Sequence, residues 1–306
     1  MSVVDLFAGL GGWDHAARQL GIDPLGIEWN ADACATREAV GLRTLHADIS
    51  ALDPADFAPC EGLIASPPCQ DFSVAGKGAG REGDRGQLVD EVMRWTDALR
   101  PRWVACEQVP PVLPIWREFA HRMEAWGYRC WTGLLSSERY GVPQTRERAI
   151  LMASLDFTPQ PPAPTHQEYR HGEPARREVG LFGDLEPWVS MAEALGWEDT
   201  YLHHPRGEGM IERVWELDRR QTGAPTIDPS AAPAPTLTGE SEGKGVWKIT
   251  DPEGERVRLT LPEGLTLQGF PPDYPVQGTK TAQWLQVGNA VPPPLAKAIL
   301  AQLVTP

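Results

Sequence analysis

One cysteine stands in a setting that suits a nucleophile. The segment Ser66-Pro67-Pro68-Cys69-Gln70 follows an apolar run at residues 62–65 that predicts a strand. Its two prolines stiffen the backbone, and open α/β sheets bind their ligands at the carboxyl edge of such strands. A thiolate placed there can add to carbon 6 of a pyrimidine and so activate carbon 5. A lone cysteine is more often a packing residue, and it is the rigid lead-in that favours Cys69 as a nucleophile.

A glycine-rich basic segment follows this cysteine. Between residues 74 and 87 the chain carries five glycines together with one lysine and two arginines. This composition is typical of a mobile flap that closes over a polyanion, although an ordinary surface loop has the same composition. Its position directly after the nucleophile favours the flap. The residues expected to contact such a polyanion in this part of the chain are Gln70, Ser73, Lys77, Arg81 and Arg85.

A second group of residues suits a nucleoside cofactor. Residues 5–12, Asp-Leu-Phe-Ala-Gly-Leu-Gly-Gly, end a predicted strand and open a predicted helix, and glycines there let a cofactor approach the backbone closely. Glu28 ends the next strand, where an acidic residue binds ribose hydroxyls. Asp48 follows the third strand and can accept a hydrogen bond from an adenine amino group. A dinucleotide fingerprint requires a glycine where this chain has Asp14, so a nicotinamide or flavin cofactor is the weaker interpretation.

Two further segments carry groups that could activate a pyrimidine. Glu107 ends the strand predicted at residues 103–107, and a carboxyl group there can bind the ring nitrogen and the exocyclic amine of the base. Residues 144–148, Gln-Thr-Arg-Glu-Arg, contain Arg146 and Arg148, whose side chains point in opposite directions if the segment is extended. We expect one arginine to face the site and the other to face supporting structure. Each of these groups, taken singly, could equally be a surface ion pair.

The elements that must position these groups alternate between strands and helices, as in a doubly wound α/β sheet. Apolar runs predict strands at residues 2–7, 25–28, 43–47, 62–65, 103–107, 130–135 and 149–153. Apolar residues at helical spacing predict helices at residues 13–20, 31–40, 88–99, 112–126 and 295–303. Residues 158–164 have the composition of a linker. From there to about residue 251 the pattern is weak, and only 191–195 and 210–217 are predicted to be helical.

Composition limits the classes of protein that fit. A chain of 306 residues can hold one large domain, or one large and one small. No apolar run approaches the ~18 residues that a membrane span needs. Five cysteines without a C-x-x-C pair argue against disulfides and zinc, and predict a reduced, cytoplasmic protein without a metal. The net charge of −14 argues against a nucleic-acid partner, so a DNA-binding surface would require a local concentration of positive charge.

Together these segments resemble the cytosine-5 DNA methyltransferase family. The resemblance rests on a fixed order of motifs along nearly the whole chain. The matching segments are 5–12, 26–29 and 48–49 for the cofactor motifs, 67–70 for the nucleophile, 144–148 for the paired arginines, and 258–271 and 288–292 for the ninth and tenth motifs. One departure is Glu107-Gln108-Val109, because the family's usual sequence is Glu-Asn-Val.

The resemblance implies a methyltransferase-type α/β fold that transfers a methyl group from S-adenosylmethionine to carbon 5 of a cytosine flipped out of a DNA duplex. In this pattern Cys69 forms a covalent adduct, Glu107 stabilises the altered ring, Arg148 holds the base, and Arg146 completes the catalytic set. The residues implied to line the cofactor pocket are Phe7, Gly9, Gly11, Gly12, Glu28, Trp29, Asp48, Ile49, Pro67, Leu88, Asn289 and Val291.

The resemblance also implies two domains. Residues 1–165 and 285–306 would form the catalytic, S-adenosylmethionine-binding domain, and residues 166–284 an inserted target-recognition domain with its hinge. The residues of this insert expected to read DNA, although each could instead be a solvated turn, are Arg219, Arg220, Gln221, Thr236 and Leu237. We expect a monomer that acts on duplex DNA, with a cognate restriction endonuclease as partner if it belongs to a restriction–modification pair.

Three other interpretations stay open at this point. A tRNA cytosine-5 methyltransferase would share the fold, but relatives of that kind lack a long recognition insert. A nicotinamide oxidoreductase would need another glycine pattern and would leave the Pro-Pro-Cys segment unexplained. A non-catalytic DNA-binding relative should have lost the nucleophile or the arginines, and all of them are present.

Overall fold

The structure, a computed structural model, divides into two compact units. It describes residues 2–68, 86–177, 183–196, 214–216, 230–239, 248–250 and 256–304. The first unit comprises residues 1–135, 147–163 and 295–306, and the second comprises residues 136–146 and 164–294. Among the residues so described, no helix is both long enough and apolar enough to cross a membrane.

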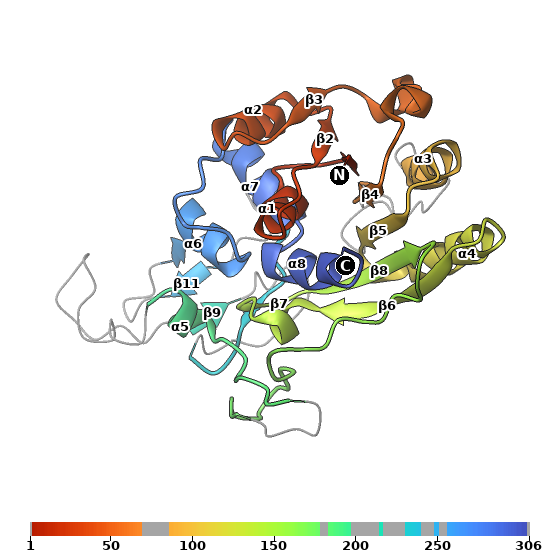
Figure 1. The fold of residues 1–306 in the computed structure, drawn as a ribbon. Helices are drawn as coiled ribbons and strands as arrows, with labels where there is room; N and C mark the ends of the chain where they lie inside the picture. Colours follow the sequence, from red (N-terminus) through yellow and green to blue (C-terminus); the bar gives the residue numbers. More distant parts are fainter. Residues whose placement is uncertain are drawn as a thin grey trace. The chain divides into compact units, whose positions relative to one another are not determined.

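A seven-stranded sheet of order β3-β2-β1-β4-β5-β8-β6 forms the first unit (Figure 1). Its strands are β1 (Val3–Leu6), β2 (Leu25–Glu28), β3 (Thr44–His46), β4 (Gly62–Ala65), β5 (Trp103–Gln108), β6 (Arg129–Ser136) and β8 (Glu147–Ser154). Strands β1 to β5 are parallel, and β8 runs antiparallel to β5. The strand order reverses between β1 and β4, which confirms the predicted doubly wound α/β fold.

Short helices accompany these strands, the last of them, α8, coming after the final strand in the chain. They are α1 (Gly12–Gln19), α2 (Ala31–Ala39), α3 (Glu91–Leu99), α4 (Leu113–Glu124) and α8 (Pro293–Ala301), with the 3₁₀ turns η1 (Ile49–Ala51), η2 (Pro54–Phe57), η4 (Gly86–Asp90) and η5 (Pro110–Val112). Helix α4 lies beside β8 (Figure 1). Its buried residues Trp116, Ala120 and Met123 recur at the spacing of one helix face, and the Trp116 indole donates to the Ala149 carbonyl of β8 at 3.0 Å.

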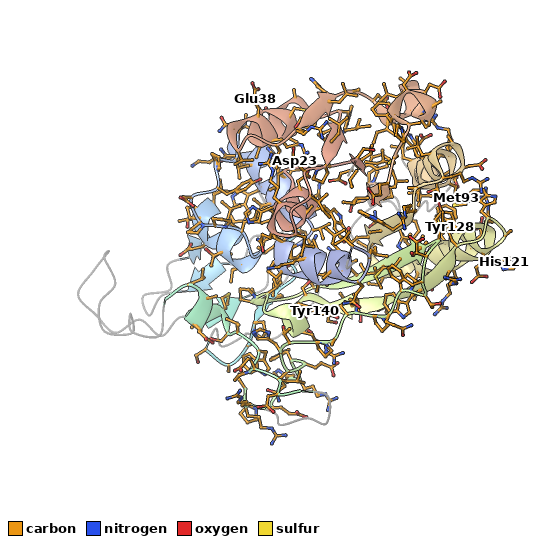
Figure 2. All side chains as sticks on the ribbon, in the orientation of Figure 1. Asp23, Glu38, Met93, His121, Tyr128 and Tyr140 are labelled. Carbon is orange, nitrogen blue, oxygen red and sulfur yellow. The ribbon has the colours of Figure 1, made fainter. Side chains whose placement is uncertain are left out.

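The interior of the first unit is continuous and apolar. Every residue of β1 and of β4 is buried, as expected for parallel strands whose sheet is covered on both faces. The large side chains Trp95 and Trp116 are completely buried in the same core. Figure 2 labels Met93 and Tyr128, which are also buried, and His121 of α4, whose side chain is 89% exposed.

The second unit contains smaller elements. They are η6 (Ser137–Tyr140), β7 (Gln144–Thr145), α5 (Met191–Ala194), β9 (Val214–Glu216), β10 (Ala234–Pro235), β11 (Lys248–Thr250), β12 (Arg256–Arg258), α6 (Leu261–Leu267) and α7 (Lys280–Asn289). Strand β10 pairs in parallel with β7, and β9, β11 and β12 form an antiparallel sheet. Met191, Leu237 and Leu267 belong to a small apolar core of this unit.

Two features of the second unit differ from the sequence-based expectation. The helix predicted at residues 210–217 is wrong where the structure describes it, because Val214–Glu216 forms β9 and pairs with β11. Such cross-strand pairing overrides a weak local preference. Helices α6 and α7 were not expected. The signal for α6 is present in the sequence, since Thr260 and Glu263 form a reciprocal capping box at its start.

Candidate active site

The site is organised by the pairing of β1 with its two neighbours. Leu6 at the end of β1 lies opposite Ile27 of β2 and Ala65 of β4. The residues that follow these three parallel strands therefore emerge at the same carboxyl edge of the sheet. This edge, next to the point where strand order reverses, is where doubly wound sheets bind their ligands.

The turn from β1 into α1 leaves its backbone open to a ligand. Phe7, Gly9 and Gly11 have φ angles of 59°, 52° and 102°, in the left-handed region that favours glycine. For a residue such as Phe7 this conformation costs about 1–3 kcal/mol and is typical of binding sites. A Cβ built on Gly9 meets no atom within 4 Å, so there is space for a ligand beside this glycine. Gly12 then begins α1.

Glu28 fixes the position of this turn from the end of β2. One oxygen of its buried carboxylate accepts a hydrogen bond from the Gly9 backbone N–H at 2.8 Å, and the other accepts from the Asn30 N–H at 2.8 Å. A carboxylate has roughly four acceptor positions. The positions that remain can accept the hydroxyl hydrogens of a ribose.

Two residues beside the turn suit a purine ring. The Trp29 side chain is 60% exposed, which is unusual for an indole, and its backbone carbonyl is held by His46 Nε2 at 2.9 Å. Asp48 caps η1 through one oxygen, Oδ1, which accepts from both the backbone N–H and the hydroxyl of Ser50. The indole offers a face for stacking, and the Asp48 carboxylate offers an acceptor for an amino group. Ile49, also expected at the cofactor, is buried.

A fully buried charge cluster supports the turn, and the sequence-based reasoning did not anticipate it. Arg37 of α2 makes two hydrogen bonds of 2.8 Å to the Asp14 carboxylate of α1, and neither side chain is exposed. The same guanidinium donates to the Ala8 carbonyl of the turn at 3.3 Å. Gly26 provides the room, because a Cβ at that position would lie 1.9 Å from Arg37 Nη2. Arg37 thus connects the turn, α1 and α2.

Asp5 completes this cluster as a buried acid. Burial raises the pKa of the Asp5 carboxyl well above its ordinary value, and the nearby Asp14 carboxylate raises this pKa further, while Arg37 opposes both effects. Asp5 therefore keeps its proton at pH values where an exposed aspartate has lost it. A protonated Asp5 leaves the negative charge of Asp14 to be balanced by Arg37 alone.

The lead-in to the predicted nucleophile is held by side chains from two other elements. Ser66 accepts a hydrogen bond from the Trp13 indole N–H of α1 at 2.9 Å, and its backbone N–H donates to the Leu6 carbonyl at 3.2 Å. The Gln108 amide, at the end of β5, donates to the Pro67 carbonyl and accepts from the Val109 N–H. Cys69 itself lies outside the described residues, as do Gln70, Ser73, Lys77, Arg81 and Arg85.

Glu107 and Arg148 form a close ion pair. Arg148 Nε lies 2.8 Å from Glu107 Oε1, and the two side chains are only 10% and 7% exposed. They come from the adjacent antiparallel strands β5 and β8, where Glu107 lies opposite Ile150. Glu107 also precedes Gln108, the residue that holds Pro67. A carboxylate and a guanidinium are therefore fixed next to the residues that anchor the nucleophile segment.

Arg146, by contrast, belongs to the second unit, and its contacts lie within that unit. Its buried guanidinium donates to the backbone carbonyls of Leu237 at 3.0 Å and Gly288 at 2.9 Å. Gln144 accepts from the Leu237 N–H at 3.0 Å, and donates to Gln268. Arg146 was expected in the catalytic set, and these contacts make it a supporting residue that ties three backbone segments together.

The remaining predicted residues of the second unit have mixed environments. Asn289 is exposed at the end of α7, and Val291 is buried. Thr236 is half-buried and its hydroxyl donates to the Thr145 carbonyl at 2.7 Å. The Leu237 side chain is 1% exposed and packs in the small core, so it has no surface with which to read DNA. Arg219, Arg220 and Gln221 lie outside the part of the chain that the structure describes.

The carboxyl edge of the first sheet therefore holds an open glycine turn, an exposed indole, an acid placed to bind a ribose, and an anchored Pro-Pro segment. These features are typical of an enzyme that binds a nucleoside cofactor. Leu88, half-buried in η4, precedes α3 in the same unit. Within the described ranges no group of three metal-ligating side chains could hold a metal ion.

The family model for the C-5 cytosine-specific DNA methylases matches residues 1–305, and the chain belongs to this family. The protein is thus a DNA (cytosine-5) methyltransferase, and S-adenosylmethionine is its methyl donor. This membership sets aside the oxidoreductase and the non-catalytic interpretations, and it favours DNA over tRNA as the substrate.

Individual relatives and solved structures are consistent with this membership. The type II methyltransferase M.NgoFVII of Neisseria gonorrhoeae is 29% identical, over 97% of this chain and 86% of the relative. The type II methyltransferase M.AplI of Arthrospira platensis is 30% identical, over 97% and 84%. The Dnmt2 methyltransferase of S. pombe has the same fold, with a TM-score of 0.69 at 19% identity over 99% of this chain and 98% of that one.

The buried acid generates the first prediction. Because the pKa of Asp5 is raised in the folded state, the folded protein holds this proton more tightly than the unfolded chain does. Wild-type stability should therefore fall as pH rises from the ordinary value of 3.8 toward the raised pKa. Asp5→Asn has the same shape and cannot ionise, so its free energy of unfolding relative to wild type should increase as pH rises from the ordinary value toward the raised pKa.

Urea unfolding at several pH values measures this difference. Asp23→Asn is the control, since the Asp23 side chain is half exposed and its substitution should show no comparable trend with pH. An Asp5→Asn variant that becomes less stable than wild type as pH rises would mean that the folded state requires an ionised Asp5.

The second prediction concerns the Trp13–Ser66 hydrogen bond. Trp13→Phe removes the donor and Ser66→Ala the acceptor, and losing one such bond costs about 1 kcal/mol. If the bond positions the nucleophile segment, either change should slow methyl transfer about fivefold in single-turnover experiments. The double variant should be no slower than the worse single variant, because both changes remove the same interaction.

Trp95→Phe serves as the matched control for this cycle. Trp95 is as deeply buried as Trp13, but its indole N–H has no hydrogen-bond partner among the described residues. Its replacement should therefore affect stability without slowing methyl transfer. Fully additive effects of Trp13→Phe and Ser66→Ala would show that the two side chains act independently.

Proposed function

We propose that this methyltransferase methylates carbon 5 of a cytosine flipped out of duplex DNA, through a covalent adduct between Cys69 and carbon 6. The observation that carries the proposal is the Glu107–Arg148 ion pair, at 2.8 Å, next to the residue that anchors Pro67. Pro67 lies two residues before Cys69 in the sequence. The acid that activates the base and the segment that carries the nucleophile are thereby fixed to each other.

The chain's own groups account for the covalent steps. The Cys69 thiolate adds to carbon 6, and the electron pair of the ring double bond moves to carbon 5, which becomes nucleophilic. Glu107 binds at the ring nitrogen and stabilises the altered ring, while Arg148 orients Glu107 and holds the base. Once carbon 5 is methylated, its proton leaves, the carbon–sulfur bond breaks, and the thiolate is released. The electron pair of the broken carbon–hydrogen bond restores the ring double bond, and the electron pair of the carbon–sulfur bond leaves with the thiolate.

The cofactor site follows from the same edge of the sheet. S-adenosylmethionine supplies an electrophilic methyl group. We assign the ribose hydroxyls to Glu28, the adenine ring to Trp29 and Ile49, and the adenine amino group to Asp48. The open turn then admits the remainder of the cofactor. The other residues that we assign to the pocket are Phe7, Gly9, Gly11, Gly12, Pro67, Leu88, Asn289 and Val291.

The family's usual asparagine is replaced here by Gln108, and its contacts support the proposal that the replacement is tolerated. The Gln108 amide hydrogen-bonds the Pro67 carbonyl on one side and the Val109 N–H on the other. Both contacts are with backbone, and the side chain is buried. Glutamine keeps the donor and the acceptor of asparagine with one more methylene. Gln108 therefore acts on the nucleophile segment rather than on the base.

We assign target recognition to residues 166–284, with residues 1–165 and 285–306 as the catalytic domain. The assignment is supported by the motifs outside that insert, which account for cofactor, nucleophile and base activation. Arg219, Arg220 and Gln221 can read base edges, and Thr236 presents a half-buried hydroxyl held against Thr145. We also propose that the protein is a cytoplasmic monomer, and the type II names of its relatives support a role in protecting DNA from a cognate restriction endonuclease.

The covalent mechanism predicts a trapped complex. DNA that carries 5-fluorocytosine at the target should form a stable adduct, because fluorine cannot leave carbon 5 as a proton does. Cys69→Ala should form no adduct and should lose at least about 1,000-fold in methylation rate, as expected when a nucleophile is removed. It should still bind S-adenosyl-L-homocysteine. Denaturing electrophoresis detects the adduct, and calorimetry measures the binding.

Cys130→Ala provides the control for this experiment. Burial raises the pKa of the Cys130 thiol to about 12, so this cysteine is not a thiolate at neutral pH. The Cys130→Ala variant should therefore be trapped like wild type. Normal methylation by Cys69→Ala would overturn the covalent mechanism.

The assignment of target recognition predicts that specificity can be transferred. Residues 166–284 would be replaced by the equivalent insert of a type II relative of known target sequence. The chimaera should methylate that relative's sites, since the catalytic groups lie outside the exchanged segment. Bisulfite sequencing of DNA from expressing cells reads the result. A chimaera that remains active but still methylates the original sites would place recognition elsewhere.

A further inference from the structure

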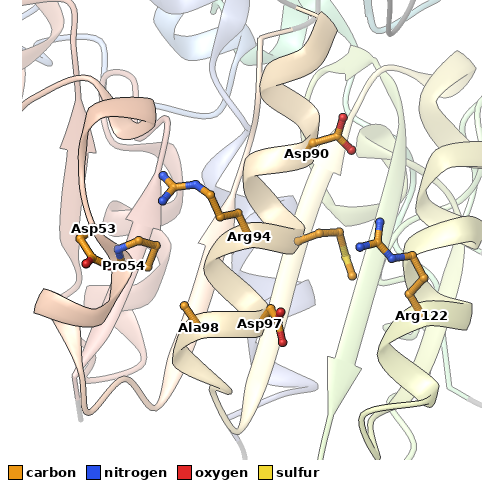
Figure 3. A pocket seen from close by; sticks show the side chains of 8 residues that line it. Asp53, Pro54, Asp90, Arg94, Asp97, Ala98 and Arg122 are labelled. Carbon is orange, nitrogen blue, oxygen red and sulfur yellow. The ribbon is translucent and has the colours of Figure 1, made fainter.

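Arg94 of α3 holds the turn that carries the assigned adenine-binding residues. Its guanidinium donates to the Ile49 carbonyl at 2.9 Å and to the Leu52 carbonyl at 3.0 Å. Figure 3 shows the Arg94 side chain extending from α3 toward the neighbouring segment that contains Asp53 and Pro54. Arg94 belongs to none of the sequence motifs that indicate the cofactor site.

The arginine is itself braced. Its Nε and Nη2 both donate to the Glu91 carboxylate one helical turn earlier, at 2.8 and 2.6 Å. A guanidinium carries five donors in a rigid plane, so it can satisfy a carboxylate and two carbonyls at the same time. Arg94 is therefore held in one orientation while it contacts the turn.

The turn needs such support because it is short. η1 has three residues, and the hydrogen-bond geometry of a 3₁₀ helix is poorer than that of an α-helix, so η1 gains little stability from its own hydrogen bonds. Asp48 caps its N-terminal end through Ser50, and Arg94 holds carbonyls at and beyond its C-terminal end. Both ends of η1 are thus tied down, and the orientation of the Asp48 carboxylate depends on both.

We propose that Arg94 is a positioning residue that gives the enzyme its preference for adenine in the cofactor. The inference rests on the role proposed above for Asp48. Adenine presents an amino group that donates to a carboxylate, whereas hypoxanthine presents an oxygen at the same position, which a fixed carboxylate repels. A carboxylate on a loosened turn can move away from that oxygen. The preference therefore depends on how firmly η1 is held.

A neighbouring arginine provides a matched control. Arg94 lines an open cavity of about 620 Å³, together with Asp90, Asp97 and Arg122 (Figure 3). On α4, Arg122 Nη1 lies 4.0 Å from Glu118 Oε1. Replacing Arg122 by methionine removes the same charge from the same cavity and leaves the carbonyl contacts of η1 in place.

The experiment compares two cofactor analogues by calorimetry, S-adenosyl-L-homocysteine and S-inosyl-L-homocysteine. Wild type should prefer the adenosyl compound. Arg94→Met should bind the adenosyl compound about tenfold more weakly, the scale of one charge-assisted hydrogen bond. It should bind the inosyl compound within about twofold of wild type, since that compound has no amino group for Asp48 to bind. The ratio of the two affinities, adenosyl over inosyl, should therefore fall about tenfold. Arg122→Met should keep the wild-type preference.

A second arginine variant guards against a folding defect. Arg94→Lys keeps the charge, but its compact ammonium cannot reach both carbonyls and the Glu91 carboxylate in one plane. Its preference should lie between those of wild type and Arg94→Met, with the maximal methylation rate at saturating cofactor retained. Thermal unfolding of each variant establishes that it is folded.

Different results would contradict the role of Arg94 and the adenine contact of Asp48. Equal weakening of both analogues by Arg94→Met and Arg94→Lys would make Arg94 a general support of the fold and overturn the inference. The same holds if the preference is unchanged, or if Arg122→Met narrows it equally. A wild type that shows no preference at all would overturn the assignment of Asp48 itself, and the inference about Arg94 with it.

Discussion

The parallel pairing of β1 with both β2 and β4 is the constraint on which the site depends. Leu6 lies opposite Ile27 and Ala65, so the cofactor turn, Glu28 and Ser66 all emerge at one edge of the sheet. A shift of one residue in either pairing would turn the side chains after that strand to the other face. Hydrogen bonds across the edge, from Gly9 to Glu28 and from Ser66 to Leu6, reinforce the same register.

The backbone segments at this edge are anchored by side chains from other elements. Prolines 67 and 68 have no backbone N–H, so neither can donate a hydrogen bond, and in the Ser66-Pro67-Pro68 segment it is the Ser66 N–H that donates, to the Leu6 carbonyl. The segment is also anchored through its acceptors, with Trp13 and Gln108 as donors. The cofactor turn likewise depends on Arg37, whose pairing with Asp14 is completely buried. Removing one member of such a pair costs about 3–5 kcal/mol, since the other is left as an unpaired buried charge.

The acidic character of the chain is compatible with a DNA substrate because several of its acids are not free. Asp14 and Glu107 are buried against Arg37 and Arg148, and burial raises the pKa of Asp5 well above its ordinary value, which disfavours its negative charge. The net charge of −14 therefore overstates the negative field at the edge of the sheet. Attraction for phosphate depends on local charge within about a Debye length, roughly 10 Å at moderate salt, rather than on the total.

Features set by short-range patterns were predictable from the residues alone. Strand ends, the glycine turn and the order of the motifs depend on neighbours close in sequence, so the α/β fold and the location of the cofactor edge could be inferred. Other features depend on contacts between distant segments. Val214–Glu216 is a strand because β11 pairs with it, and Leu237 is buried because a second core forms around it. Arg94 and Ile49 are 45 residues apart, and Gln108 and Pro67 are 41 apart. Such hydrogen bonds exist only once packing has brought the elements together, so no periodicity or local propensity along the chain encodes them.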